Sequence, residues 1–478
     1  MKRRPLIEKL KEYNEAYIPM HMPGHKRNTE LSPRSSYLKD LSAHLDITEV
    51  QGFDDLHSPE GILLESMREA AEFWGSETSR YLVNGSTCGI LSVIYALTEP
   101  GDKILVARNC HKSVYHAVEI RDLHPVFILP EEDEETGILL DIRPDQVKSK
   151  LIEHGDIKLV VITSPTYEGV ISDIQKICMQ AHEQGIPVLV DEAHGAHLGH
   201  FDIFPESAVR LGADVVIQSM HKTLPSLTQT AILHINGKLI DHEKICRAIS
   251  MFETSSPSYL LIASMDSCMR LLKEEGKILL KEWRSDLDSV RRGMEELRYL
   301  KLFGRKRKNF FDYDVSKIVI YTGDTSMTGK ELAELLRRKY RIETEMSSTD
   351  YCTAMTGLGD RMEDLKQLGR ALREIDRELE RFSPGGGRST KTKYLLPKQC
   401  VDIGRALSSP DEIVGHSEAE GRICSEYVWA YPPGIPLLAP GEFITSEILA
   451  LFESYAEQGI ELRWGKKHSS KEVCVLLP

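Results

Sequence analysis

The sequence has no long hydrophobic run, no close pair of cysteines and no excess of positive charge. Its apolar stretches, such as VVIT and PVLV, are as long as a strand and far short of the roughly 20 residues that cross a bilayer. Residues 1–15 begin basic and turn amphipathic, without the apolar segment of a secretion signal. We therefore expect a cytoplasmic protein that does not contact a membrane.

The cysteines and the charge exclude further classes. Nine cysteines are an odd number, and they are scattered without a CxxC pair, which predicts reduced thiols rather than disulfides or a zinc finger. The net charge of −13 argues against a nucleic-acid binder, whose affinity rests on Lys and Arg at phosphates. The length of 478 residues and the 41% hydrophobic content predict a soluble globular chain of two or three domains.

Strand-like and helix-like segments alternate between residues 63 and 233. The strands KILVA, HPVFIL, LVVIT, IPVLVDEA and ADVVIQ are separated by stretches such as DIQKICMQAHEQG. Such alternation is typical of βαβ units and predicts an α/β domain with a parallel sheet. Ligands of these sheets bind beyond the carboxyl ends of the strands, so residues that directly follow a strand are the candidates for function.

The second half of the chain predicts a smaller unit. Residues 259–300 have helical spacing and form one long or two consecutive helices, and SKIVIY and GKELAELLRRKY then predict a strand and a helix of a second α/β unit. By composition, SPGGGRSTK (383–391) is the clearest loop.

Two motifs point to functions that the rest of the sequence does not support. DEAH (191–194) is typical of helicases, but the segment from Gly323 has one residue too many for a phosphate loop, and Glu331 replaces the required hydroxyl. His194, His197 and His200 have a spacing of three, yet no carboxylate or Cys at zinc-site spacing completes a metal site. We expect no metal.

Lys222 lies in SMHKTLPSLTQT, a polar turn between two predicted strands. A single lysine in a turn is usually a solvated surface residue. Three other segments also follow strands, however. Gly85, Ser86 and Thr87 in NGST precede an apolar helix, where free N–H groups and hydroxyls can hold a phosphate. Asp191 ends the strand PVLV, and His111 follows KILVA.

These residues together are the set that pyridoxal 5′-phosphate (PLP) requires. The aldehyde needs a lysine, the ring nitrogen needs a carboxylate, the ring needs flat or apolar packing and the phosphate needs a helix start. Lys222, Asp191, His111 with Ala193, and the segment 85–87 can fill these roles.

Seven motifs carry a resemblance to a known family. They are HMPGHKRN (21–28), NGST (84–87), NCHKS (109–113), SPTYEGV (164–170), VDEAHGAHLG (190–199), SMHKTLPSLTQ (219–229) and YPPGIPLLAPGE (431–442). In this order, across nearly the whole chain, they resemble the ornithine/lysine/arginine decarboxylases among the fold type I PLP enzymes, most closely the short arginine/lysine decarboxylase-like branch of Gram-positive bacteria.

The resemblance implies a fold: an aspartate aminotransferase-like large domain with a mainly parallel sheet between helices, and a smaller α/β C-terminal domain. It also implies a homodimer or larger homo-oligomer with the site at the subunit interface. The segments we expect are an N-terminal interface segment (1–60), a PLP-binding major domain (61–300), a small α/β domain (301–382), a linker (383–391) and a C-terminal decarboxylase domain (392–478).

The resemblance further implies roles for single residues. Lys222 would bond covalently to PLP, Asp191 would face the pyridine nitrogen, His111 would stack on the ring and Ala193 would pack on its other face. Ser86, Thr87, Ser219 and His221 would surround the phosphate and the covalent link, with His221 or Lys222 as proton donor to Cα. The alternative for His221 is a turn residue that caps a strand.

The substrate implied is a basic amino acid, with arginine converted to agmatine as first choice and lysine or ornithine as alternatives; such amines belong to polyamine biosynthesis. Glu442 is our candidate for the substrate's cation, although it could equally be a solvated loop residue, and His25 could contribute across the interface. His194, also expected near the cofactor, stands where larger family members usually carry Trp. They also have an added N-terminal domain, so their large assembly is not implied.

Other functions stay open at this stage. An aminotransferase would use the same lysine and aspartate but would hold the substrate carboxylate with an arginine that we cannot place. A PLP-dependent lyase is a further alternative. An inactive homologue that regulates a partner is disfavoured because Lys222 and Asp191 are both present.

Overall fold

The structure is a computed structural model that describes residues 4–20, 22–29, 32, 35, 37–304, 309–379, 394–431, 434–457 and 461–477. The predicted loop 383–391 lies outside the described residues. No described helix is both long and apolar enough to span a membrane. All nine cysteines are described, and each is a free thiol.

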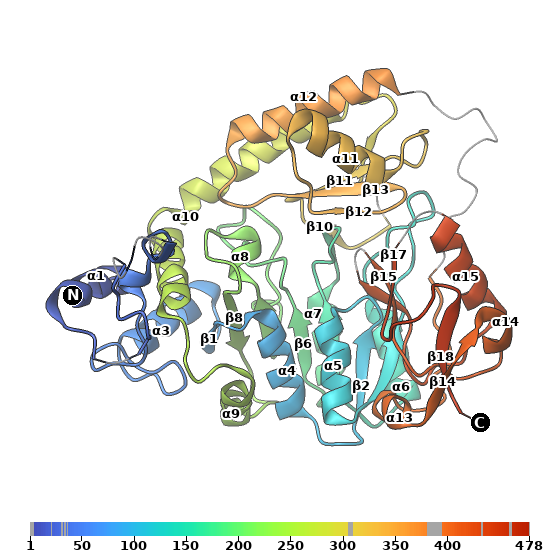
Figure 1. The fold of residues 1–478 in the computed structure, drawn as a ribbon, viewed down its shortest axis with the longest axis horizontal. Helices are drawn as coiled ribbons and strands as arrows, with labels where there is room; N and C mark the ends of the chain where they lie inside the picture. The colour runs from blue at the N-terminus through green and yellow to red at the C-terminus, as the bar shows by residue number, and fades with distance from the viewer. Residues whose placement is uncertain are drawn as a thin grey trace.

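A seven-stranded sheet forms the centre of the large domain (Figure 1). Its order is β1 (Thr78–Leu82), β8 (Ala231–Ile235), β7 (Val215–Gln218), β6 (Val188–Asp191), β4 (Ile157–Thr163), β2 (Lys103–Ala107) and β3 (His124–Ile128). The ladder is parallel from β7 to β3, whereas β8 runs antiparallel to both of its neighbours. The predicted α/β class with a mainly parallel sheet is confirmed.

Helices cover both faces of this sheet, so the strands are apolar on both sides. One face packs in a single hydrophobic core with residues from α3 (Ile62–Trp74), α6 (Pro144–Glu153), α7 (Ile174–His182) and the start of α10 (Tyr259–Met294). The other face packs with α4 (Gly85–Leu97), α5 (Lys112–Arg121) and α9 (His242–Phe252). These helices leave the carboxyl ends of the strands free, and the candidate active site lies there.

The small domain follows the long helix α10, which confirms the helical prediction for this region as one helix that ends at Met294. Its sheet has the order β12 (Met346–Ser347), β13 (Tyr351–Met355), β11 (Lys317–Tyr321) and β9 (Lys301–Leu302), with α11 (Gly329–Tyr340) and α12 (Met362–Glu378) beside it. The short strand β10 (Asp312–Tyr313) pairs with β5 (Val170–Ile171) of the large domain. The small domain is thereby fixed above the sheet (Figure 1).

The two ends of the chain lie at opposite ends of the molecule, and the N-terminal segment packs into the core of the large domain (Figure 1). The N-terminal segment contains α1 (Leu6–Ala16), α2 (Tyr37–Asp40) and η2 (Ala43–Leu45). The C-terminal unit has its own core and contains α13 (Ile403–Ser408), β14 (Asp411–Gly415), α14 (His416–Ala419), β15 (Val428–Tyr431), β16 (Ile435–Leu438), α15 (Ser446–Glu457), β17 (Glu461–Trp464) and β18 (Glu472–Leu476).

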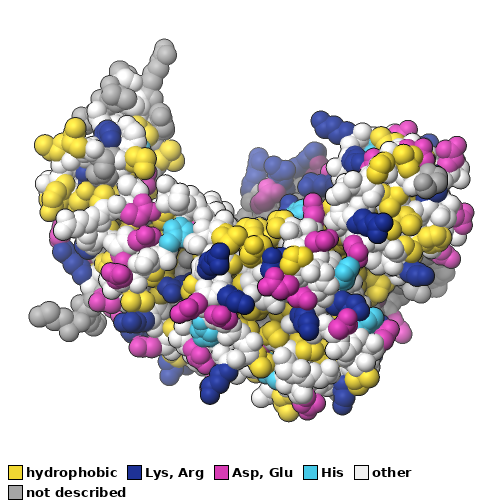
Figure 2. All heavy atoms as spheres, turned by 90° about the horizontal axis from the view of Figure 1, so that it is seen from below, with side chains coloured by type: hydrophobic (Ala, Val, Ile, Leu, Met, Phe, Trp, Pro, Cys, Tyr) yellow, Lys and Arg dark blue, Asp and Glu magenta, His cyan; other side chains and the backbone are white. Residues whose placement is uncertain are grey.

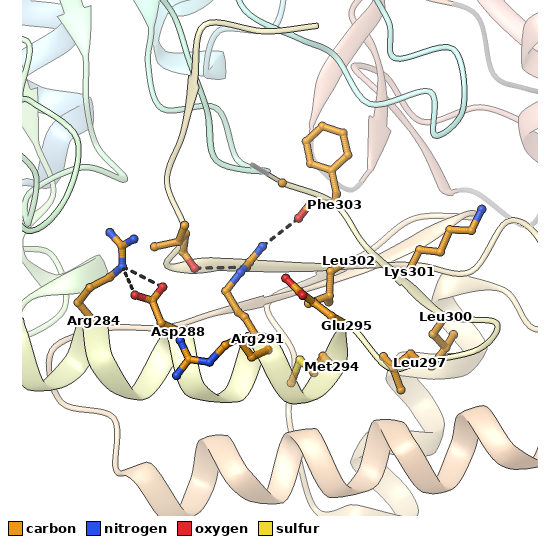
Figure 3. A pocket seen from close by; sticks show the side chains of 13 residues that line it. Arg284, Asp288, Arg291, Met294, Glu295, Leu297, Leu300, Lys301, Leu302 and Phe303 are labelled. Atoms are coloured by element: carbon orange, nitrogen blue, oxygen red, sulfur yellow. Dashed lines mark hydrogen bonds and ion pairs between the residues drawn. The ribbon is translucent and has the colours of Figure 1, made fainter. Parts of the chain in front are cut away.

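A pocket between the end of α10 and β9 is lined by several cations (Figure 3). Arg284 is paired with Asp288, and Arg291 donates to the carbonyls of Phe303 and Lys317, at 3.1 Å each. Arg291 joins the helix to the small domain, whereas the pair of Arg284 and Asp288 lies within the helix.

Two buried histidines make the stability of the large domain depend on pH. Burial lowers the pKa of His200 and of His234 to about 3. Nδ1 of the His234 ring lies 2.8 Å from Ser79 Oγ. The unfolded chain takes up protons near pH 6.5 that the folded chain does not, so their stabilisation is complete above about pH 6.5 and is lost as pH falls toward 3. Each contributes about 1.4 kcal/mol per pH unit in this window.

We expect His234→Gln to reduce the pH dependence of the free energy of unfolding, because the variant takes up about one proton fewer when it unfolds. Urea unfolding at pH 6.0 and pH 5.0 measures it: the difference between the two pH values should be about 1.4 kcal/mol smaller in the variant than in the wild type. An unchanged difference would contradict a neutral, buried His234.

Candidate active site

Lys222 lies at the carboxyl rim of the sheet, between β7 and β8. The sequence predicted a polar turn here, but the structure has a one-turn helix, α8 (Met220–Thr223), with Lys222 on it. Its Nζ is 3.0 Å from Nε2 of His194, which follows β6. The small domain lies above this rim, and Leu358 N donates to Thr223 O at 2.9 Å. Lys222 is therefore half-buried between the two domains.

Asp191 is the last residue of β6 and is 3% exposed. Its Oδ1 accepts a hydrogen bond from Ala193 N at 3.2 Å, and its register partner on β4 is Thr163. Thr163 Oγ1 and His194 Nδ1 are buried without a hydrogen-bond partner in the described structure. Since buried polar atoms are normally paired, these two mark places where a ligand can bind.

The start of α4 provides the predicted phosphate cradle. Gly85 has a φ of +74°, and the side chain of Asn84 does not cap the helix, so the first turn can receive an external anion. Ser86 Oγ lies 2.7 Å from Ser219 Oγ, and both residues are buried. Thr87 is exposed on the same turn. The contact between Ser86 and Ser219 brings this helix start to the segment that contains Lys222.

Two further predicted histidines lie at this rim. His111 is the N-cap of α5, its Nδ1 is 2.8 Å from Ser113 Oγ, and its side chain is exposed and can stack on a ligand. The charges of Asp191 and Lys222 both act on the His111 ring. His221 donates from Nδ1 to the carbonyl of Thr230 at 2.8 Å, which leaves Nε2 as the acceptor of the neutral ring.

The surroundings of Lys222 lower the pKa of its amine from the ordinary value of a lysine. Burial is the largest influence and lowers the pKa of Lys222; the positive charge of Lys317 lowers it further, and Asp191 and Glu345 oppose this. Burial and the charges of Lys222 and Lys317 also hold the pKa of His194 well below its ordinary value. A neutral lysine is the form that attacks a carbonyl carbon.

Sequence reasoning did not identify several residues beside this site. Tyr167 packs against His194 with ring centroids 4.7 Å apart, and its hydroxyl donates to Glu345 of the small domain. Lys317 donates to the carbonyl of His194 at 3.4 Å. The signal in the sequence was a lysine inside the otherwise apolar strand SKIVIY, three residues after Asp314.

Two predicted substrate residues have other partners in the described structure. Glu442 is fully buried, and its two oxygens accept from Arg108 NH1 and NH2 at 2.7 and 2.9 Å. Our expectation that Glu442 holds the substrate's cation therefore needs correction, because both of its oxygens already bind a guanidinium. His25 lies in the N-terminal segment, with Nε2 3.2 Å from Asp46 Oδ2, and no described contact joins it to Lys222.

The three histidines considered for a metal point to different partners. His194 contacts Lys222, His197 bonds Asp314 Oδ1 at 3.1 Å, and the ring of His200 packs on Phe73 with centroids 4.4 Å apart.

The residues at the rim fit PLP. An uncapped helix start, a buried carboxylate, an exposed ring, a half-buried lysine and two unpaired buried polar atoms lie together at the edge where α/β sheets bind ligands. The fold has the architecture of the fold type I PLP-dependent enzymes.

The comparisons with known proteins identify the family. A model of the Orn/Lys/Arg decarboxylase major domain matches residues 4–321, and one of the C-terminal domain of the same family matches residues 392–462. The chain therefore belongs to the Orn/Lys/Arg decarboxylase family. It is 33% identical to an arginine decarboxylase of Bacillus anthracis, over 96% of this chain and 94% of that protein.

Other relatives agree with this assignment. An arginine decarboxylase of Bacillus subtilis is also 33% identical, over 96% of this chain and 95% of its own length. Among solved structures, the lysine decarboxylase of Francisella novicida aligns with a TM-score of 0.84 at 18% identity, over 98% of this chain and 80% of that chain. The predicted family and fold are confirmed.

Proposed function

We propose that this protein is a PLP-dependent decarboxylase of a basic amino acid, with L-arginine converted to agmatine and carbon dioxide as first choice. The observation that carries the proposal is the contact of Lys222 with His194 at the sheet rim, with Asp191 and the start of α4 beside it. Arginine is favoured because the Bacillus relatives of that name align along nearly their whole length. A lysine decarboxylase of Escherichia coli matches 54% of this chain at 28% identity.

Each residue at the rim has a proposed role. Lys222 would form the covalent link to PLP, Asp191 would keep the pyridine nitrogen protonated, and His111 and Ala193 would pack against the ring. A second group holds the phosphate and the surroundings of the link: Gly85, Ser86, Thr87, His194, Ser219 and His221.

When bound, PLP supplies an electron sink for the pair that the Cα–carboxylate bond releases. Asp191 would stabilise the positive charge on the ring nitrogen that makes the sink effective. Lys222 or His221 would then return one proton to Cα, so that the amine and carbon dioxide would be the only products. The half-buried position of Lys222 between the two domains limits water at this step.

The test is a substrate panel. The purified protein with PLP is incubated separately with arginine, lysine and ornithine, and the amine released is identified as agmatine, cadaverine or putrescine. Release of one amine without a keto-acid acceptor supports a decarboxylase, whereas a requirement for an acceptor would show an aminotransferase. Ammonia or a keto acid instead of carbon dioxide would indicate another lyase, and no reaction at all would favour a regulatory homologue.

We also propose a homodimer with the site at the subunit interface, located in the cytoplasm. The N-terminal segment, which we assign to residues 1–60, has Tyr17, Ile18, Met20 and Met22 exposed by 60–89%. Figure 2 shows hydrophobic side chains on the lobe at this end of the molecule. An exposed apolar patch of this kind is typical of an interface. We also propose a major domain at residues 61–300, a small domain at 301–382, a linker at 383–391 and a C-terminal decarboxylase domain at 392–478.

Subunit mixing tests the interface and the proposed role of His25. Lys222→Ala and His25→Ala homodimers should both be inactive, and mixing them should restore up to about a quarter of the wild-type activity, because half of the subunits pair across and one site in each pair is intact. Amine release before and after mixing measures it. Verified heterodimers without activity would contradict a contribution of His25 across the interface.

A further inference from the structure

A second lysine, Lys317, lies fully buried at the start of β11 in the small domain. Its Nζ donates to Asp314 Oδ2 and to Ser316 Oγ, both at 3.1 Å, and to the carbonyl of His194 at 3.4 Å. The three donors of an ammonium group therefore have three acceptors, although the side chain has no access to water.

Asp314, the anion that pairs with Lys317, also has hydrogen-bond partners for both of its oxygens. Asp314 is 0% exposed, Ser316 Oγ donates to its Oδ2 at 2.7 Å, and His197 Nε2 is 3.1 Å from its Oδ1. Burial alone would raise the pKa of Asp314, but the charge of Lys317 and the contact with His197 hold it far below its ordinary value. Asp314 and Lys317 thus form a salt bridge inside the protein.

A buried ion pair is seldom needed for stability alone, since apolar residues of similar size often stabilise as well or better. This pair also joins two domains at the active site. Asp314 and Lys317 belong to the small domain, whereas His194 and His197 belong to the loop after β6. The carbonyl of His194 accepts from Lys317, and the imidazole of the same residue contacts Lys222.

The charged groups around Lys222 come from several elements. Asp191 faces it from β6, and His194 from the loop that follows. His111 lies at the start of α5, and Lys317 and Glu345 belong to the small domain. Of these, Lys317 is the buried cation, and its own immediate neighbours are Asp314, Ser316, His194 and His197.

We propose that Lys317 is a positioning residue for Lys222: it holds the loop that places the His194 ring against Lys222, and its buried positive charge beside this loop disfavours a second positive charge on Lys222. The proposal rests on the proposed function, in which Lys222 bonds to PLP. For that bond the neutral amine nitrogen attaches to the aldehyde carbon, and its two hydrogens leave with the aldehyde oxygen as water. A protonated amine lacks the electron pair for the first step.

The experiment measures the protonation of Lys222 directly in cofactor-free protein. Trace acylation across a pH series, followed by digestion and mass spectrometry, gives the pH at which Lys222 becomes half-reactive. In Lys317→Met this midpoint should move to higher pH. In Asp314→Asn, which keeps the cation and removes the anion, it should not move upward.

Controls separate electrostatics from loosening of the fold. The double variant K317M/D314N removes both charges and should again move the midpoint upward, while Lys339→Met, an exposed lysine of the small domain, should leave it unchanged. Thermal unfolding verifies that each variant is folded. An unchanged midpoint in Lys317→Met, or equal upward shifts in Lys317→Met and Asp314→Asn, would overturn the proposal.

The outcome is independent of which amino acid is decarboxylated. If the wild type releases no amine but the midpoint of Lys222 shifts as expected, the proposed function fails and the role of Lys317 stands. If the wild type is active and the midpoint does not shift, the proposed function stands and the role of Lys317 fails.

Discussion

Replacing Lys222 by alanine is expected to abolish amine release, with a loss in kcat on the order of 10⁴-fold or more. The variant loses the amine that bonds to the cofactor and one of the two proposed proton donors to Cα. The remaining residues, Asp191 and Ser86 among them, can still hold the ring and phosphate, so weak cofactor binding should persist. Carbon dioxide release and the absorbance of bound PLP measure the two properties separately.

A matched control is Lys176→Ala, which removes an exposed lysine of the same domain that pairs with Asp173. Its kcat should stay within about twofold of the wild type, because the Lys176 side chain is exposed and no described contact joins it to Lys222. If Lys222→Ala kept more than a few per cent of the wild-type kcat, Lys222 would not be the residue that bonds to the cofactor.

Removing the charge of Glu442 is expected to cost about 3–5 kcal/mol of the free energy of unfolding. Glu442→Gln leaves the Arg108 guanidinium fully buried with no anion, since Arg108 is 1% exposed and bonds both Glu442 oxygens. The pair joins the end of β2 to the C-terminal unit, 334 residues later in the chain. Urea unfolding measures the loss.

Two comparisons decide how the result is interpreted. Glu412→Gln breaks an exposed pair with Arg422 and should cost less than about 1 kcal/mol. The double variant Arg108→Met with Glu442→Leu should cost less than Glu442→Gln alone, because no unpaired charge stays buried. A Glu442→Gln variant of normal stability whose only defect is a higher KM would restore Glu442 as a substrate ligand.

The fold could be predicted because its elements carry local signals. The strands of the central sheet are apolar on both faces, and the helices between them have helical spacing, so both were visible in the sequence. The antiparallel direction of β8 was not, because AILHI is apolar in the same way as its parallel neighbours and direction depends on the connection through α8. The one-turn helix at Lys222 was likewise too short to give a periodic signal.

The site was predictable where a residue directly follows a strand and unpredictable where it depends on distant pairing. Asp191, Ser86 and Lys222 could be inferred to share one rim because each ends or follows a predicted strand. The partner of Glu442 could not, because Arg108 lies more than 300 residues away, and an isolated Glu after Pro-Gly carries no sign of burial. The contact of Lys317 with the His194 carbonyl likewise joins two domains whose docking no local pattern describes.

The central claim is that Lys222 bonds to PLP at the carboxyl rim of the sheet. The most direct test is to incubate the purified protein with PLP, reduce it with borohydride, digest it and map the modified residue by mass spectrometry. The account predicts one pyridoxyl group per chain, on Lys222. Modification of a different lysine, or no stable modification of the folded protein, would contradict it.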